Sequence, residues 1–182
     1  MNNPKKYLMA LQSVLNNLDL QEFEDAIEVI KKHWKVGSKI IVCGNGGSAL
    51  TALHYVTDWN KSISQYTNRP FKGFSLIDNV GLITAYANDM SYEDAFSQQL
   101  SVIGNEGDLL IVVTGSGNSE NVVRAINYAK SNGIKTLGLV GFDGGKVKQK
   151  LDNFVHVVVD DMQISEDVHL IFGHMVMRAL CS

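Results

Sequence analysis

Five short runs of apolar and often β-branched residues recur along the chain, and longer segments with helical spacing separate them. The runs cover residues 39–43, 73–77, 109–113, 136–140 and 154–159. None shows the alternation of polar and apolar residues that is typical of a strand with one solvated face, so helices are expected on both faces. The intervening segments are long enough for right-handed crossovers. The sequence therefore predicts an α/β fold with a doubly wound, five-stranded parallel sheet.

The remaining segments predict helices around this sheet. Residues 4–35 carry apolar side chains at helical spacing, with a break near residues 16–17, which predicts a helix or helical hairpin ahead of the first strand. Further helices are predicted at 47–62, 79–88, 91–103, 119–132 and 164–180, with a short turn at 144–149 and a surface loop at 63–72. The two prolines, Pro4 and Pro70, leave the interiors of these helices free of a breaker.

Composition excludes several classes of protein. The 182 residues are 45% hydrophobic and 19% charged, which predicts one domain, 1–182, with an ordinary core. A net charge of −3 without a long basic run argues against broad electrostatic binding of nucleic acid. No stretch approaches the roughly 18 consecutive apolar residues of a membrane span. Because Cys43 and Cys181 lie far apart and no secretory leader is evident, a reducing cytoplasm is the expected compartment.

The loop after the first predicted strand has the properties of an anion site. Ligands of open α/β sheets bind beyond the carboxyl ends of the strands. There the chain has Gly44-Asn45-Gly46-Gly47-Ser48, followed at once by a helix. Glycines permit close backbone approach, the helix N-terminus offers free N–H groups, and Ser48 adds a hydroxyl at the cap. A plain strand-to-helix turn capped by Ser48 explains the same residues, so this loop alone leaves both interpretations open.

The loop after the third predicted strand strengthens the ligand interpretation. It carries Thr114-Gly115-Ser116-Gly117-Asn118-Ser119 ahead of a helix, with three hydroxyls within six residues. Hydroxyls and backbone amides bind a phosphate monoester without a cationic side chain. Ser119 alone could be an ordinary N-cap. Two such loops on strands that a doubly wound order can place side by side favour a site for a phosphorylated small molecule.

A dinucleotide site is the competing interpretation of the first loop. Gly44, Gly46 and Ala49 match the pattern Gly-x-Gly-x-x-Ala. The acidic partner expected about 20 residues later is missing, because Asp58 falls inside the predicted helix and Asp78 is too distant. The hydroxyl-rich second loop is also superfluous for a dinucleotide. The monophosphate interpretation is therefore preferred.

Polar residues on two predicted helices could carry chemistry. His54 and Asp58 are four residues apart and share one helix face, and Glu166 and His174 are eight apart, again on roughly one face. Two histidines and two carboxylates can form a divalent metal site or an acid and base pair. A His–Asp pair on a helix is more often a surface or structural pair. The pair Asn88-Asp89 could contact sugar hydroxyls or merely end a helix.

The order of these motifs resembles the sugar isomerase (SIS) family, and within it the phosphoheptose isomerases. The resemblance covers nearly the whole chain, including the leading helical segment. It implies a flavodoxin-like SIS fold and an aldose–ketose isomerase that converts sedoheptulose 7-phosphate to D-glycero-D-manno-heptose 7-phosphate for the heptose of lipopolysaccharide or capsule. It also implies a cytoplasmic homotetramer with sites at subunit interfaces, in which residues 1–36 pack between subunits.

The resemblance also implies roles for individual residues. Substrate contacts fall on Asn45, Gly46, Gly47, Ser48, Asn88 and Asp89, and phosphate contacts on Thr114, Gly115, Ser116 and Ser119. The metal and catalytic set of the family is a histidine, a glutamate four residues later, and a glutamine and histidine eight residues apart. These positions hold His54, Asp58, Glu166 and His174, which implies one zinc ion per subunit.

Two of these four residues depart from the family pattern. Asp58 is one methylene shorter than the glutamate, and Glu166 places a carboxylate where the family has an amide. Both can still bind zinc. The proton that moves between the substrate carbons could be carried by Asp58 or by Glu166, with His174 moving protons at the oxygens. The departures also leave open a non-catalytic SIS module that binds a phosphosugar or a protein partner.

Overall fold

The computed structural model describes residues 3–182, so the first two residues of the predicted 1–36 segment lie outside it. Its sheet has five parallel strands in the order β2-β1-β3-β4-β5. The strands are β1 (Ile40–Gly44), β2 (Gly73–Ser75), β3 (Leu109–Thr114), β4 (Lys135–Val140) and β5 (Asn153–His156). The predicted doubly wound parallel sheet is thus confirmed, with the strand ends shifted by up to three residues.

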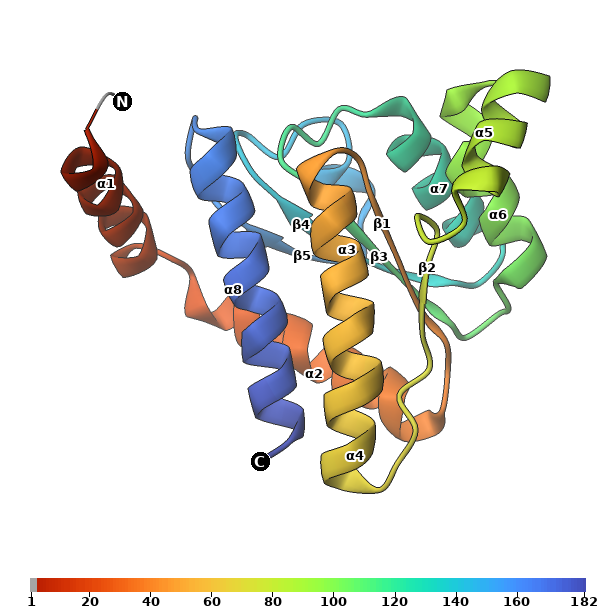
Figure 1. Cartoon of the computed structure of the whole chain (residues 1–182), viewed down its shortest axis with the longest axis horizontal. Helices are drawn as coiled ribbons and strands as arrows, with labels where there is room; N and C mark the ends of the chain where they lie inside the picture. Colours follow the sequence, from red (N-terminus) through yellow and green to blue (C-terminus); the bar gives the residue numbers. More distant parts are fainter. Residues whose placement is uncertain (1–2) are drawn as a thin grey trace.

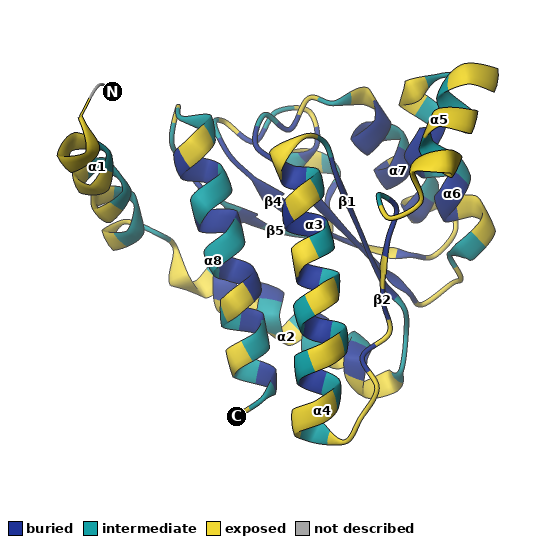
Figure 2. Ribbon diagram, in the orientation of Figure 1, coloured by how far each residue is buried: buried dark blue, intermediate teal, exposed yellow. Residues whose placement is uncertain are grey.

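Helices cover both faces of the sheet, as Figure 1 shows. The helices α2 (Leu20–Val36), α3 (Gly47–Asp58) and α8 (Met162–Leu180) pack on one face, and α6 (Ala95–Ile103) and α7 (Glu120–Ser131) on the other. In β1, Ile40 and Val42 join the first core while Ile41 and Cys43 join the second. Each such side chain contributes roughly 2 kcal/mol when buried. This two-sided burial explains why the apolar runs do not alternate (Figure 2).

The N-terminal segment forms two helices, α1 (Pro4–Asn16) and α2, separated near the predicted break. Asp19 begins α2 by accepting a hydrogen bond from the backbone N–H of Gln21 at 3.0 Å. None of the residues of α1 is fully buried, and the helix projects from the body of the molecule in Figure 1. Tyr7 ties it to α8 by donating to the Asp167 carboxylate at 2.5 Å. That hydrogen bond is the main reason why the pKa of Tyr7 rises to about 12.

The helix after the first loop extends further than the sequence predicts. Beyond α3 the chain makes a π-helical turn, η1 (Trp59–Ile63), and one more helical turn, α4 (Ser64–Thr67). The predicted surface loop at 63–72 is therefore wrong over residues 63–67. Trp59 and Ile63 are fully buried, so core contacts hold this part of the chain helical. The helix ends at Asn68, which adopts the left-handed conformation with φ 53°.

The remaining elements follow the prediction closely. They are α5 (Val80–Asp89), the 3-10 turn η2 (Tyr92–Asp94) that precedes α6, and the 3-10 turn η3 (Lys148–Lys150). Within residues 3–182, no helix combines the length and the apolar character that crossing a membrane requires.

Candidate active site

The two glycine-rich loops leave the sheet side by side. β1 and β3 are neighbouring parallel strands, and Gly44 at the end of β1 pairs with Val113 near the end of β3. Residues 45–48 and 115–119 therefore emerge at the same carboxyl edge, where ligands of such sheets bind. The paired loops that the sequence indicates thus share one edge of the sheet.

The first loop turns into α3 through Gly46, which adopts φ 56° and caps the helix. Ser48, predicted at the cap, is instead the second residue of the helix and is buried. A positive φ favours glycine at the turn, so the helix begins one residue before the serine. The Glu166 carboxylate lies against Gly47, where a β-carbon would approach its two oxygens to 2.6 and 2.7 Å. The missing side chain at residue 47 therefore makes room for Glu166.

The loop after β3 keeps its hydroxyl protons available. The Thr114 hydroxyl oxygen accepts from the Gly117 backbone N–H at 3.2 Å, and the Ser116 hydroxyl oxygen accepts from the Asn118 N–H at 3.3 Å. Because both oxygens act as acceptors, their O–H groups can still donate to an anion. Ser119 is the N-cap of α7, but its side chain makes no capping hydrogen bond within the described chain. This loop can therefore present three hydroxyl donors and the N-terminus of α7 to one phosphate.

The segment after β4 supports this second loop. The Gly141 N–H donates to the Gly115 carbonyl at 2.9 Å, and the Val147 N–H donates to the Gly117 carbonyl at 3.1 Å. Gly117 adopts φ 63°, and a β-carbon there would collide with the backbone of Gly144. The loop geometry is thus set by backbone contacts, which favours a preformed anion site.

Three polar side chains converge between α3 and α8. The Nε2 atoms of His54 and His174 lie 3.1 Å apart, and Asp58 Oδ2 lies 3.3 Å from His54 Nε2 and 4.0 Å from His174 Nε2. One donor atom from each of these residues falls within 4.8 Å of the other two. Two imidazole nitrogens and a carboxylate oxygen are a ligand set that zinc accepts, with a position left open for substrate. The group is partly exposed, so a ligand can reach it.

Buried contacts between α3 and α8 fix the spacing of this group. The two helices run side by side in the same direction in Figure 1. Trp59 Nε1 donates to the Gly173 carbonyl at 3.0 Å, and the Tyr55 hydroxyl donates to the His169 carbonyl. Burial raises the pKa of Tyr55 well above its usual value, so this hydroxyl stays protonated. The side chains that hold the helices together thus alternate with those that form the metal group.

Glu166, the fourth predicted ligand, is not brought into this group. Its carboxylate lies at Gly47, and His54 is seven residues, or about 10 Å, further along α3. Asn88 and Asp89 sit at the C-terminal end of α5, where the Asn88 amide donates to the Asp89 carboxylate at 2.8 Å. Among residues 3–182, no hydrogen bond joins this pair to either loop. The structure thus places Glu166 beside the first loop and leaves the Asn88-Asp89 pair at the exposed end of a helix.

Sequence reasoning missed one polar residue at the loops. Asn121 is 2% exposed, and its side chain pairs with that of Asn45 through two hydrogen bonds of 2.9 Å. The signal was available, because Asn121 continues the buried stripe of Ala125 and Ala129 at intervals of four residues. An amide on such a stripe must find buried partners.

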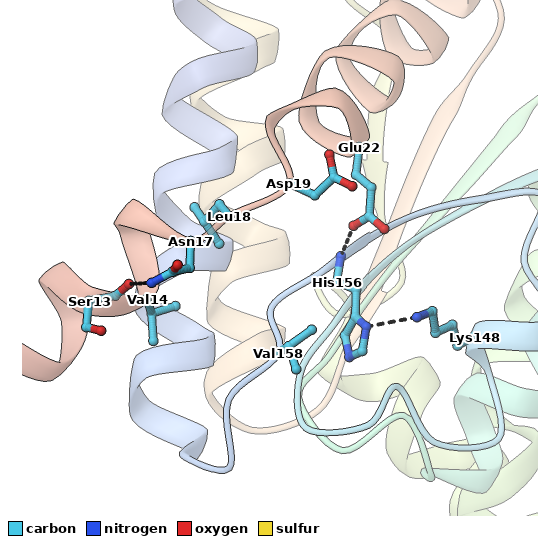
Figure 3. A pocket seen from close by; sticks show the side chains of 9 residues that line it. All are labelled: Ser13, Val14, Asn17, Leu18, Asp19, Glu22, Lys148, His156 and Val158. Atoms are coloured by element: carbon cyan, nitrogen blue, oxygen red, sulfur yellow. Dashed lines mark hydrogen bonds between the residues drawn. The ribbon is translucent and has the colours of Figure 1, made fainter.

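Two cavities lie beside β5, the last strand in the order of the sheet. One, of about 590 Å³, is lined in part by Ser116 and Asn118 of the second loop, and also by His156. The other, of about 410 Å³, lies between β5 and the corner of α1 and α2. Figure 3 shows His156 there between Glu22 and Lys148. Lys148 Nζ donates to His156 Nδ1 at 2.9 Å, and His156 Nε2 forms a hydrogen bond of 3.0 Å with the Phe142 carbonyl. These contacts hold the His156 ring in place.

Fold and loops together define the class: a doubly wound α/β protein with two glycine-rich loops, one of them rich in hydroxyls, at the carboxyl edge of its sheet, where proteins of this class bind ligands. The protein-family model for the SIS domain matches residues 6–141 of this chain. The chain is 33% identical over 178 residues to the phosphoheptose isomerase of Aliarcobacter butzleri, covering 97% of this chain and 94% of that protein. It is 36% identical over 172 residues to that of Helicobacter pylori, with 94% and 85% covered. The chain belongs to the SIS domain family, among the phosphoheptose isomerases.

A solved structure agrees with this assignment. The phosphoheptose isomerase GmhA of Neisseria gonorrhoeae superposes with a TM-score of 0.87 at 26% identity, covering 97% of this chain and 93% of the other. Because almost the whole length of both chains is included, the N-terminal helices belong to the shared fold.

Proposed function

We propose that the protein is an aldose–ketose isomerase that converts sedoheptulose 7-phosphate to D-glycero-D-manno-heptose 7-phosphate. The product would serve bacterial heptose biosynthesis for lipopolysaccharide or capsule, in the cytoplasm. Relatives named phosphoheptose isomerase along nearly the whole chain support this substrate. The observation that carries the proposal is the group of His54, Asp58 and His174, of which the first two lie on α3, the helix that begins at the first of two loops suited to a phosphosugar.

The proposed substrate contacts divide between the loops. Thr114, Gly115, Ser116 and Ser119 bind the phosphate, and Asn45, Gly46, Gly47, Ser48, Asn88 and Asp89 bind the sugar. Neither loop contains a lysine or arginine, so hydroxyls, backbone amides and the N-terminus of α7 have to carry the anion. The Asn88-Asp89 pair would need a shift of α5, or a neighbouring subunit, to reach a sugar bound at the loops.

His54, Asp58 and His174 would hold one zinc ion. The carboxylate of Asp58 belongs to this group, whereas that of Glu166 lies outside it and faces the first loop. When bound, zinc would polarise the substrate's carbonyl and hydroxyl oxygens. Two residues are candidates to carry the proton between the substrate carbons: Asp58, which lies in the group, and Glu166, which is free of the group but would have to reach the sugar carbons from the first loop.

The isomerisation moves one proton between the two carbons and one between their oxygens. Glu166 takes a proton from C1 of the ketose while the oxygen on C2 receives one, which forms an enediol; His174 can give that proton only when its Nε2 is free of the metal. Glu166 then returns the proton to C2 while the oxygen on C1 loses one, which yields the aldose. Asp58 is the alternative proton carrier if its carboxylate is free of the metal.

Proton NMR in deuterated water tests this function. The metal-stripped protein is mixed with sedoheptulose 7-phosphate, and zinc is then added. An aldoheptose phosphate with deuterium at C2, formed only with zinc, is the expected result. Substrate binding without turnover in either state would instead support the non-catalytic SIS module that the departures at Asp58 and Glu166 leave open.

The protein is also proposed to act as a homotetramer, with the whole chain as one domain. Helix α1 exposes Leu8 and Met9 at 64% and 60% and contributes no buried residue of its own, which suits a surface that packs between subunits. Light scattering of the purified protein would give the mass directly. A monomer would overturn the assignment of residues 1–36 to subunit packing.

A further inference from the structure

A pair of side-chain amides joins the two loops of the site. Asn45 Nδ2 donates to Asn121 Oδ1, and Asn121 Nδ2 donates to Asn45 Oδ1, both at 2.9 Å. Asn45 is in the first loop, and Asn121 is in the first turn of α7, directly after the second loop. The Tyr92 hydroxyl also donates to Asn45 Oδ1, at 2.7 Å. One carbonyl oxygen of the first loop thus receives two hydrogen bonds from other elements.

A backbone donor fixes the orientation of both amides. Turning both side chains over would preserve a reciprocal pair, so the pair alone does not define which atoms are oxygens. The Val122 N–H resolves this, because it donates to Asn121 Oδ1 at 2.9 Å and requires an oxygen there. Asn45 must then present its Oδ1 to Asn121 and Tyr92. The second N–H of the Asn45 amide is left over as a donor.

The elements that supply these partners are themselves tied together. Arg124 of α7 forms an ion pair with Asp94 of η2 at 2.6 Å, which holds the turn carrying Tyr92 against α7. Asn121 is buried, so its hydrogen bonds do not compete with water. The amide of Asn45 is therefore held by hydrogen bonds from Asn121 and Tyr92, and Asn121 lies on α7, the helix that follows the second loop.

We propose that Asn121 is a positioning residue for the substrate. It fixes the Asn45 amide so that a donor, and not the carbonyl, faces the sugar, and it sets the first loop in register with the phosphate held by the second. This inference rests on the proposed function, in which Asn45 contacts a sugar phosphate. Because a contact that holds the sugar equally in the bound substrate and in the transition state contributes to binding, its loss should raise KM more than it lowers kcat.

A double-mutant cycle tests the proposal. Asn121→Ala in the otherwise unaltered protein should raise KM for sedoheptulose 7-phosphate about tenfold and leave kcat within roughly twofold. In the Asn45→Ala background the same change should alter KM by less than about twofold, because the group to be positioned is gone. Asn127→Ala, an exposed asparagine of the same helix, is the matched control and should behave as the unaltered protein.

Tyr92→Phe protects the test against misfolding, since Tyr92 is half-exposed and loses only the hydroxyl that grips Asn45. It should raise KM about threefold in the unaltered protein and have no effect beside Asn45→Ala. Equal effects of Asn121→Ala in both backgrounds, or a loss confined to thermal stability, would overturn the positioning role.

The dissociation constant of sedoheptulose 7-phosphate, measured by calorimetry on the same variants, separates the two proposals. If the unaltered protein binds sedoheptulose 7-phosphate but does not convert it, the isomerase assignment fails. The double-mutant cycle can then still be evaluated from the dissociation constants. Absence of both binding and turnover would overturn the inference together with the function on which it rests.

Discussion

His54 and His174 face each other through their Nε2 atoms at 3.1 Å, although 120 residues separate them in the chain. Two lone pairs cannot point at one another at this distance. Either one ring donates an N–H to the other, or both bind a shared cation. With Asp58 Oδ2 beside them, the three side chains offer such a cation two nitrogen ligands and one oxygen ligand.

Zinc binding should therefore depend on both histidines. His54→Ala and His174→Ala are each expected to lower bound zinc from about one per subunit to near zero, because two remaining ligands hold the ion poorly. Elemental analysis after dialysis measures this. His33→Gln is the control, since His33 bonds the Val29 carbonyl at 2.8 Å within α2. Full zinc content in both alanine variants would show that zinc does not bind at His54 and His174.

Substitutions of Glu166 and Asp58 should differ in their effects on kcat and on zinc content. Glu166→Gln is expected to lower kcat by about 10²-fold or more while zinc content is unchanged, because the amide cannot carry a proton. Asp58→Asn should instead lower zinc content together with activity. Kinetics paired with metal analysis distinguish them. If Glu166→Gln retains full activity, the proton carrier is Asp58.

The second loop should determine phosphate affinity. Ser116→Ala removes a hydroxyl donor that the fold leaves free, so KM should rise about tenfold with the melting temperature unchanged. The matched control is Ser131→Ala, at the exposed C-terminal end of α7, and its KM should equal that of the unaltered protein. Steady-state kinetics give the answer, and an unchanged KM would count against this loop as the phosphate site.

Stability should fall in mild acid because of His169. The residue is fully buried, neither ring nitrogen has a hydrogen-bond partner within the described chain, and burial lowers its pKa from 6.5 to about 4. The unfolded chain binds a proton below pH 6.5 while the folded protein does not, so folding free energy is lost between pH 6.5 and 4. The loss amounts to roughly 3 kcal/mol at pH 4. Urea titrations across this range should show it.

His169→Leu isolates this effect. A buried apolar side chain has no proton to take up, so the variant should lose less stability than the unaltered protein as the pH falls from 6.5 to 4. An identical decline in both proteins would show that other groups govern the acid sensitivity.

The sequence predicted the sheet well because each strand is buried on two faces and leaves an uninterrupted apolar signal. It could not predict helix α4, since the burial of Trp59 and Ile63 comes from contacts with distant elements. At the site, pattern alone grouped Glu166 with His174, because both lie on one face of α8. Eight residues are about 12 Å along a helix, and Glu166 packs against Gly47, so its carboxylate lies away from the metal group. Asn121 was missed because one polar residue in an apolar stripe carries little weight without its partner.

The π-helical turn η1 has a consequence for how this chain can vary in length. Each turn of a π-helix closes with a longer hydrogen-bonded ring and holds about one residue more than an α-turn. Residues 59–63 are therefore a place where one residue can be lost and the helix can revert to regular geometry. His54 and Asp58 precede that turn, so such a deletion would leave their spacing intact.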